Sequence, residues 1–462
     1  MLQEPPEIGP LSTLSIHQRT LVHWEQISAV FETNPKWTMG SFWAPELYYM
    51  NGTFYCYYTA RGTDGISKIG VATTKDIAKG FKDMGVLIDW GDEAIDAYVF
   101  QENDKIYITW KAYGLTPDKP IQILGSELSK DGLSLIGDHF NLVTAEEGNW
   151  EKGGIEGQAI IKRDDFLYML YSGNACCGKD CDYMVGVARA KSIKGPWEKH
   201  DLNPILSGNS QWKCPGHGTA TTFNDDWYYL YHGYNTKGFP RLGRAALLSR
   251  LYWNEETGWP SFRVEPDVVN GNRVTHDFID NFKEDNAGYK WKYNVKNNPF
   301  TAEIKNNRLT LSESQPDSEN PTGTVLCVIP DDAYFKISTK VLNVNKALKG
   351  LVLYTTKNNS LGLGLKDGTI VIWKVQDGSY NEIVTKQLPT FKNGVWLKVA
   401  MNPNNTIDMQ YSTDNKQWKT LKAPNGENLA WWSSGMKAGL QVRKDTSSND
   451  NQAIFDSFSI QY

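Results

Sequence analysis

The chain has 462 residues, which is more than one hydrophobic core usually serves, so two domains are expected. Its formal net charge of −5 is spread along the sequence without a basic patch, which argues against nucleic acid as a partner. No run of about 20 apolar residues occurs, so no insertion into a membrane is expected, and no signal peptide is visible at the start of the sequence.

The first predicted elements are two strands joined by a turn within residues 10–30. Four larger units follow, and each has a short motif, an apolar strand, a polar or glycine turn and a strand that ends in aromatic residues. These units run from Trp43 to Leu87, from Asp96 to Val143, from Glu156 to Leu206 and from His217 to Phe262. Recurring four-stranded units without helical periodicity are typical of β-propeller blades. A β-sandwich is the alternative, but it gives no reason for whole units to recur.

The spacing of the units predicts a first blade that is incomplete. Their heads lie 53, 60 and 61 residues apart, so one more step before Trp43 falls upstream of Met1. The outer-strand residue Trp24 precedes Trp43 by 19 residues, as Trp197 precedes the last blade head by 20. We therefore expect residues 10–30 to be the outer half of the first blade. The chain is then a fragment, its start is assigned too late, or other residues close the ring.

The four blade heads are predicted to surround one pocket, because the innermost strands of a propeller open on one face around the central channel. The heads are Trp43, Asp96, Glu156 and His217. Two carboxylates on neighbouring blades suggest acid and base chemistry, such as the protonation of a glycosidic oxygen. The alternative is that Asp96 and Glu156 only cap turns. The 12% aromatic content suits a β-rich protein and also the stacking of sugar rings.

Four cysteines lie close to the last two blade heads along the chain: Cys176, Cys177, Cys181 and Cys214. Three readings are open, namely one or two disulfides, free thiols, or a zinc site, although the spacings fit no standard zinc pattern. Disulfides would indicate an oxidising compartment.

The composition changes after Pro260, which divides the chain into a propeller domain at 1–265, a linker at 266–276 and a second domain at 277–462. Segments with period-2 alternation in the second domain predict an antiparallel β-sandwich. Its terminal segments, 276–282 and 453–462, are expected to pair as strands. The predicted fold class is therefore all-β, with a five-bladed propeller followed by a sandwich.

Several motifs together resemble glycoside hydrolase family 43, the five-bladed propeller hydrolases. They are Trp43-Ala44-Pro45-Glu46, the Asp96 head, Glu156-Gly157, Gly216-His217-Gly218 and the closing GRAALLSRLYW with GWP. The resemblance covers roughly residues 10–265 in order. Residues 277–462 resemble the concanavalin-like sandwich, of jelly-roll type, that is often appended to such enzymes.

The resemblance implies a secreted or periplasmic, inverting, exo-acting glycosidase that releases arabinose, xylose or galactose units from plant polysaccharides or their oligosaccharides. Glu156 would be the general acid, and Asp96 would tune its pKa and orient the substrate. His217 would lie at the central channel, where the family often holds calcium through water. Trp43 would stack on a sugar, and Arg244 would hold a sugar hydroxyl or help to set the pKa of the acid. As alternatives, Trp43 packs in a blade core, Arg244 is a surface charge and His217 is structural.

One departure from the family pattern leaves a second function open. The family's general base is an aspartate at the head of the first blade, and no aspartate precedes Asp64 here. Glu4 and Glu7 are weak substitutes, because they lie in a proline-rich stretch. The alternative function is a non-catalytic carbohydrate-binding propeller. A retaining fructan hydrolase on a similar fold is disfavoured, because its Asp-Pro-Asn and Arg-Asp-Pro motifs are missing and Gly157 follows the candidate acid.

Overall fold

The computed structural model describes residues 12–14, 21, 27–31, 33–113, 119–178, 180–237, 241–263, 275–283, 290–293, 300–313, 320–389, 391, 393–403, 406–422, 424, 429 and 435–462. These residues fall into two compact units. The propeller unit holds residues 12–237 and 244–263, and the sandwich unit holds 241–243 and 275–462. The linker predicted over 266–276 lies outside the described residues except for its last two positions.

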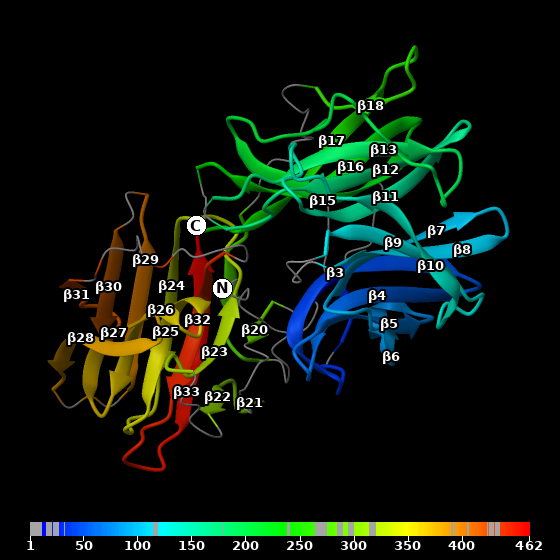
Figure 1. The fold of residues 1–462 in the computed structure, drawn as a ribbon. Helices are drawn as coiled ribbons and strands as arrows, with labels where there is room; N and C mark the ends of the chain where they lie inside the picture. The colour runs from blue at the N-terminus through cyan, green and yellow to red at the C-terminus, as the bar shows by residue number, and fades with distance from the viewer. Residues whose placement is uncertain are drawn as a thin grey trace. The chain divides into compact units, whose positions relative to one another are not determined.

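The propeller unit contains four antiparallel sheets of four strands, each paired in chain order (Figure 1). Blade 2 consists of β3 (Thr38–Met50), β4 (Thr53–Gly62), β5 (Ser67–Thr74) and β6 (Lys82–Ile88), with the 3₁₀ helix η1 (Ile77–Lys79) between the last two. Blade 3 consists of β7 (Ala94–Glu102), β8 (Lys105–Ala112), β9 (Gln122–Leu128) and β10 (Leu135–Thr144). Blade 4 consists of β11 (Ile155–Arg163), β12 (Phe166–Gly173), β13 (Met184–Ala190) and β14 (Glu198–Lys199). Blade 5 consists of β15 (Trp212–Phe223), β16 (Asp226–Asn235), β17 (Arg244–Trp253) and β18 (Pro260–Ser261).

A short pair of strands precedes these blades. Strand β1 (Ser12–Leu14) pairs antiparallel with β2 (Ser28–Ala29), where the sequence predicts the outer strands of a first blade. The four predicted four-stranded units are confirmed, and so is the propeller architecture.

Apolar side chains between neighbouring blades form the core of the propeller unit. One cluster joins Ile108 of blade 3 to Val71 of blade 2, and another joins Ile123 of blade 3 to Met169 of blade 4. Blade 4 packs against blade 3 on one face and against blade 5 on the other, so its central strands are apolar on both faces, as in the fully buried stretch of β12. This packing fixes the inner strands and thereby the candidate site.

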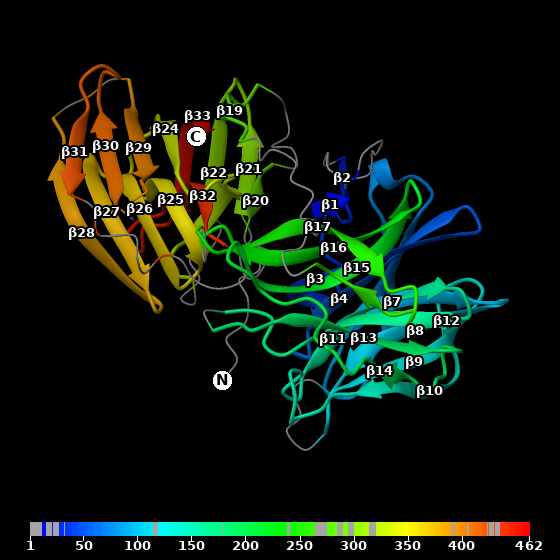
Figure 2. The same cartoon turned by 90° about the horizontal axis from the view of Figure 1, so that it is seen from above.

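The sandwich unit has two antiparallel sheets, drawn as two layers in Figure 2. One sheet has the order β21-β22-β33-β24-β29-β30-β31, with β19 also paired to β33. Its strands are β19 (Phe278–Asp280), β21 (Phe300–Ile304), β22 (Leu309–Glu313), β24 (Phe335–Val341), β29 (Val395–Met401), β30 (Ile407–Ser412), β31 (Lys419–Lys422) and β33 (Gln452–Gln461). The other has the order β20-β23-β32-β25-β26-β27-β28. Its strands are β20 (Lys292–Tyr293), β23 (Thr324–Val328), β25 (Leu348–Thr356), β26 (Asn359–Lys366), β27 (Thr369–Gln376), β28 (Ser379–Gln387) and β32 (Lys437–Arg443).

Period-2 alternation builds the sandwich core. Strand β29 alternates buried and half-buried residues along its whole length, and its buried side chains join a cluster with residues such as Leu363 and Phe455. The predicted pairing of the terminal segments is confirmed, because Phe278 of β19 lies opposite Ile460 of β33. Within the described ranges, no helix has the length and apolarity needed to cross a bilayer.

Candidate active site

All four inner strands of the propeller unit depart from regular pairing at their predicted heads. The register shifts between Ile95 and Tyr98, between Glu156 and Ala159 and between Gly216 and Thr219. In β3 it shifts on both sides of Trp43. A β-bulge redirects side chains that a regular strand would alternate between its two faces. Each head residue therefore lies at or within an irregularity of the same kind.

Left-handed backbone conformations accompany these bulges. Asp96 has φ 58° and His217 has φ 46°, which is uncommon for residues with a side chain. Gly157 has φ 60°, and a Cβ atom there would lie 2.7 Å from the Cγ atom of His217. The His217 ring thus packs against a backbone position that only glycine can occupy without a clash.

Asp96 is contacted by residues of three other strands, namely β4, β11 and β15. Its backbone N–H donates to Thr59 Oγ1 of blade 2 at 3.1 Å, and its Oδ2 accepts from the Gly157 N–H of blade 4 at 3.2 Å. Gln158 Nε2 donates to the Asp96 carbonyl oxygen at 2.7 Å. His217 Nδ1 of blade 5 lies 3.6 Å from Oδ2. Burial raises the pKa of Asp96, and the nearby Glu156 adds to this while His217 opposes it.

Glu156 accepts two hydrogen bonds from side chains. Lys111 Nζ of β8 donates to Oε2 at 2.9 Å, and Tyr183 Oη donates to Oε1 at 2.8 Å. Lys111 also lies 3.6 Å from Oε2 of Glu93, which is only 5% exposed. Burial raises the pKa of Glu156, but Lys111, His217 and Tyr183 together lower it by more, and the pKa falls to about 2. Glu156 is therefore ionised in this arrangement, whereas a general acid at rest would hold a proton.

The residues behind Glu156 form a rigid support. The Tyr183 ring stacks on His232 with a centroid distance of 5.7 Å, and Arg244 Nη1 donates to His232 Nε2 at 3.2 Å. A disulfide joins Cys181, two residues before Tyr183, to Cys214 of β15. Arg244 is thus connected to Glu156 through two aromatic rings.

The structure brings together most of the residues predicted for the pocket. Asp96, Glu156 and His217 converge through the contacts above, and exposed Arg244 joins them through His232. Trp43 is half-buried and lies opposite Thr59, the residue that accepts from Asp96. None of these positions is a remote surface site, although their predicted roles remain proposals.

Sequence reasoning missed Lys111, Tyr183, Glu93 and Gln158. A lysine within the otherwise buried run of β8 was the one visible signal, because an ammonium is rarely placed there without a carboxylate. Tyr183 offered no such signal, since aromatic residues are abundant in every blade.

The cysteine prediction is confirmed in its disulfide form. Cys176 pairs with Cys177 and Cys181 pairs with Cys214, which leaves these thiolates unable to ligate zinc. Within the described residues, no group of three or more His, Cys, Asp or Glu side chains could hold a metal ion. Calcium prefers several oxygen ligands. Around His217 the described contacts supply the Asp96 carboxylate, so these donors do not fit direct calcium binding, and calcium held there through water stays a prediction.

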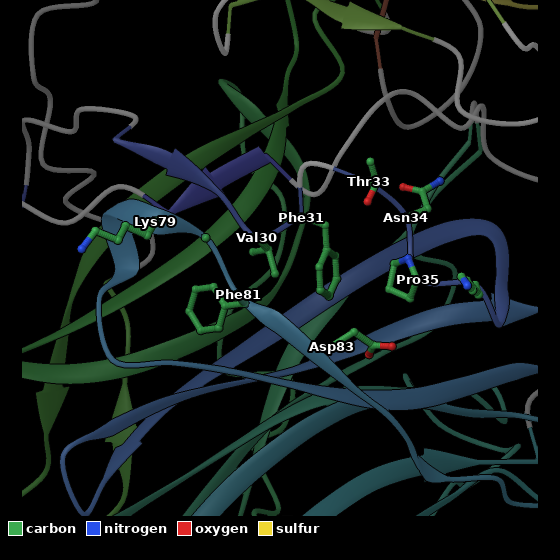
Figure 3. A pocket seen from close by; sticks show the side chains of 10 residues that line it. Val30, Phe31, Thr33, Asn34, Pro35, Lys79, Phe81 and Asp83 are labelled. Carbon is green, nitrogen blue, oxygen red and sulfur yellow. The ribbon is translucent and has the colours of Figure 1, made fainter.

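A separate cavity of about 410 Å³ lies beside blade 2 and contains none of the predicted site residues (Figure 3). Its lining includes Phe31, Pro35, Phe81 and Asp83. The Asp83 carboxylate accepts a hydrogen bond from buried Tyr58 at 2.6 Å, so Asp83 has a structural role.

Comparison with known families and proteins agrees with this geometry. The pattern of Glycosyl hydrolases family 43 matches residues 12–260, and that of the Beta xylosidase C-terminal Concanavalin A-like domain matches 279–461. An extracellular exo-α-(1→5)-L-arabinofuranosidase of Cellvibrio japonicus is 26% identical over 271 residues, covering 52% of this chain and 77% of that enzyme. A xylan 1,3-β-xylosidase of a Vibrio species is 28% identical over 276 residues, covering 53% of this chain and 50% of that enzyme.

The fold has a match over nearly its whole length. The crystal structure of a xylan β-1,4-xylosidase from Bacillus halodurans superposes with a TM-score of 0.80 at 18% identity and covers 99% of both chains. At this identity the likeness concerns the architecture, a propeller followed by a concanavalin-like sandwich.

Proposed function

The chain belongs to family 43 of the glycosyl hydrolases, and from that membership we propose that it releases arabinose, xylose or galactose units from plant cell-wall polysaccharides or their oligosaccharides. Enzymes of this family hydrolyse O-glycosyl bonds with inversion, which supports the same activity for this chain. The choice among the three sugars follows from its relatives, which are named arabinofuranosidases and xylosidases, and from the resemblance of its motifs.

One observation carries the assignment of roles: Asp96 and Glu156 stand on neighbouring bulges and are joined through the Gly157 N–H. In inverting hydrolysis an acid protonates the leaving oxygen while a base activates water on the opposite face of the sugar. We assign the acid to Glu156, because part of its side chain is exposed to an incoming ligand. Asp96 is more buried, so its charge acts on Glu156 and on substrate orientation.

Arg244 and Trp43 complete the proposed substrate contacts. Arg244 is exposed, and its guanidinium keeps donors available beyond the one directed at His232, so it can bind a sugar hydroxyl. Trp43 is half-buried at its bulge, so one part of the ring remains for stacking on a sugar. His217 packs on Gly157 and faces Asp96, which suits a polar group of the channel.

Secretion is part of the same proposal. Two disulfides occur near the site, and disulfides persist in oxidising compartments. The arabinofuranosidase from Cellvibrio japonicus is named an extracellular enzyme.

The alternative is a carbohydrate-binding protein without turnover, and two observations favour it. Lys111 donates to the Glu156 carboxylate and so favours its ionised form, and the described residues of the β1–β2 pair, 12–14 and 27–31, include no carboxylate that could serve as a base. Glu4 and Glu7 lie outside the described residues.

A direct assay separates the two functions. The purified chain is incubated with aryl α-L-arabinofuranoside, β-D-xyloside and β-D-galactoside, and the anomeric configuration of the first product is read by proton NMR. Hydrolysis of at least one glycoside with inversion supports the enzyme. Absence of turnover on all three, together with sugar binding in calorimetry, would establish the binding protein instead.

A further inference from the structure

Lys111 is a single ammonium placed between two carboxylates. Its Nζ atom lies 2.9 Å from Oε2 of Glu156 and 3.6 Å from Oε2 of Glu93. The exposed fractions of the three side chains are 12% for Lys111, 18% for Glu156 and 5% for Glu93. In such a poorly hydrated place a cation interacts strongly with both anions, and its position between them matters.

Both oxygen atoms of Glu156 are occupied by donors in this arrangement. Oε1 accepts from Tyr183 and Oε2 accepts from Lys111. A lysine ammonium has three donors and no acceptor, so a proton on Oε2 would compete with Lys111 for the lone pairs of that oxygen and would remove the negative charge that attracts the ammonium. Protonation of Glu156 therefore weakens its pairing with Lys111 and favours a move of the ammonium toward another carboxylate.

Glu93 is the group that can receive Lys111. It already lies within ion-pair distance, whereas Asp96 is engaged by the Gly157 N–H and faces His217. Burial raises the pKa of Glu93, and Lys111 opposes this, so a closer Lys111 would stabilise its charged form. The titratable and charged groups that face Glu156 are Glu93, Asp96, Lys111, Tyr183 and His217.

We propose that Lys111 changes its ion-pair partner from Glu156 to Glu93 whenever Glu156 takes up the proton that it later donates, which makes Lys111 and Glu93 positioning residues for the acid. This rests on the proposed role of Glu156. The proton comes from solvent water at the exposed edge of Glu156, and Lys111 keeps all its protons throughout. Once Glu156 has protonated the leaving oxygen it is again a carboxylate, and Lys111 returns to it.

Two variants shift the protonation of Glu156 in opposite directions. In Lys111→Met the cation is gone, so Glu156 gains its proton at higher pH, and the alkaline limb of kcat/KM moves up by about one pH unit or more. In Glu93→Gln the receiving carboxylate is gone, so Lys111 stays on Glu156. The alkaline limb then moves down by about one pH unit, and kcat/KM at neutral pH falls about tenfold.

A matched control exists on the same strand. Lys105 of β8 also pairs with a glutamate, Glu127, at 2.6 Å, but it lies outside the site. Lys105→Met should leave the pH profile unchanged. In Lys111→Met two buried carboxylates are left without their cation, which can prevent folding. The double variant Lys111→Met/Glu93→Gln then serves instead, because it removes one of these two negative charges. Its alkaline limb should still move upward.

Infrared difference spectroscopy gives a reading that needs no turnover. The carboxyl band of Glu156 is identified as the band lost in Glu156→Gln, and its titration midpoint is followed in wild type and in each variant. Midpoints that move up in Lys111→Met and down in Glu93→Gln support the partner change. Equal midpoints, or shifts in one direction, overturn it. A chain that hydrolyses no glycoside but shows the opposed shifts refutes the proposed function alone.

Discussion

The blade heads of the propeller unit and the strands of the sandwich unit use the same backbone pairing in different ways. In the sandwich, β25 and β32 pair over seven consecutive residues from Leu348 to Tyr354 without a shift. Every inner strand of the propeller unit is interrupted by a bulge at its head. Regular pairing places alternate side chains in a core, whereas a bulge redirects a side chain toward the channel.

The chemistry of the two regions differs accordingly. The sandwich unit has a large cluster of apolar side chains, with residues such as Leu363 and Leu397 fully buried. The blade heads instead gather Glu93, Asp96 and Glu156 around the ammonium of Lys111. We therefore expect substitutions at the heads to change turnover, and substitutions in the sandwich core to change stability.

The largest effect on turnover is expected for Glu156→Gln. Because general acid catalysis contributes about 10²–10⁴-fold, kcat/KM should fall by that factor on a glycoside with a poor leaving group. The loss should be much smaller on a dinitrophenyl glycoside, whose leaving group needs no proton. Steady-state rates on the two substrates measure the ratio of the two losses. An equal loss on both substrates would show that Glu156 is not the general acid.

Gly157→Ala should have the next largest effect. The new Cβ atom would approach His217 at 2.7 Å in a left-handed conformation, so the bulge must shift at a cost of about 1–3 kcal/mol. We expect kcat/KM to fall about ten- to hundredfold.

Gly52→Ala is the control for this substitution, because Gly52 has φ 75° with no atom within 4 Å of its added Cβ. It imposes similar backbone strain without the clash. If both variants lost turnover equally, strain alone would explain the result and the packing on His217 would be irrelevant.

Asp96→Asn should have a smaller effect with a characteristic direction. Its charge disfavours the ionised form of Glu156, so removing that charge lowers the pKa of Glu156. The alkaline limb of kcat/KM should therefore move to lower pH, with a loss of about tenfold at neutral pH. A pH profile from 4 to 9, roughly spanning the limb, measures the shift. A limb that moves upward would contradict the arrangement.

The smallest effect on turnover is expected for Leu363→Ala in the sandwich. Leu363 is fully buried, so its truncation should lower the free energy of unfolding by about 2–5 kcal/mol. Urea unfolding measures this loss, while kcat of the folded protein should stay within about twofold of wild type. A parallel loss of turnover would mean that the two regions are not independent in function.

The blades and the residues of their heads could be predicted because their signals are local. Alternation, turns and recurring aromatic strands mark each unit, and aligning the units brings Asp96 and Glu156 to corresponding positions. Such patterns depend on the geometry of strands rather than on distant contacts.

The bulges and the partners of Glu156 could not be predicted in this way. A bulge is defined by how a strand pairs with its neighbour, which the sequence of one strand does not state. Lys111 lies on the second strand of blade 3 and Tyr183 directly precedes the third strand of blade 4, and they reach Glu156 across 45 and 27 positions of sequence. The disulfide pairing likewise had three solutions for four cysteines.

Because of the disulfide between Cys181 and Cys214, complete folding of the site depends on the redox state of the surroundings. The disulfide joins blade 4 to blade 5 across 33 positions, and closing such a loop stabilises the fold by about 3–4 kcal/mol. A chain synthesised in a reducing cytosol lacks this link, so the support behind Tyr183 is completed only where thiols are oxidised. Recombinant protein from the cytoplasm and recombinant protein from an oxidising compartment would then share one sequence but differ in the support of Tyr183 at the site.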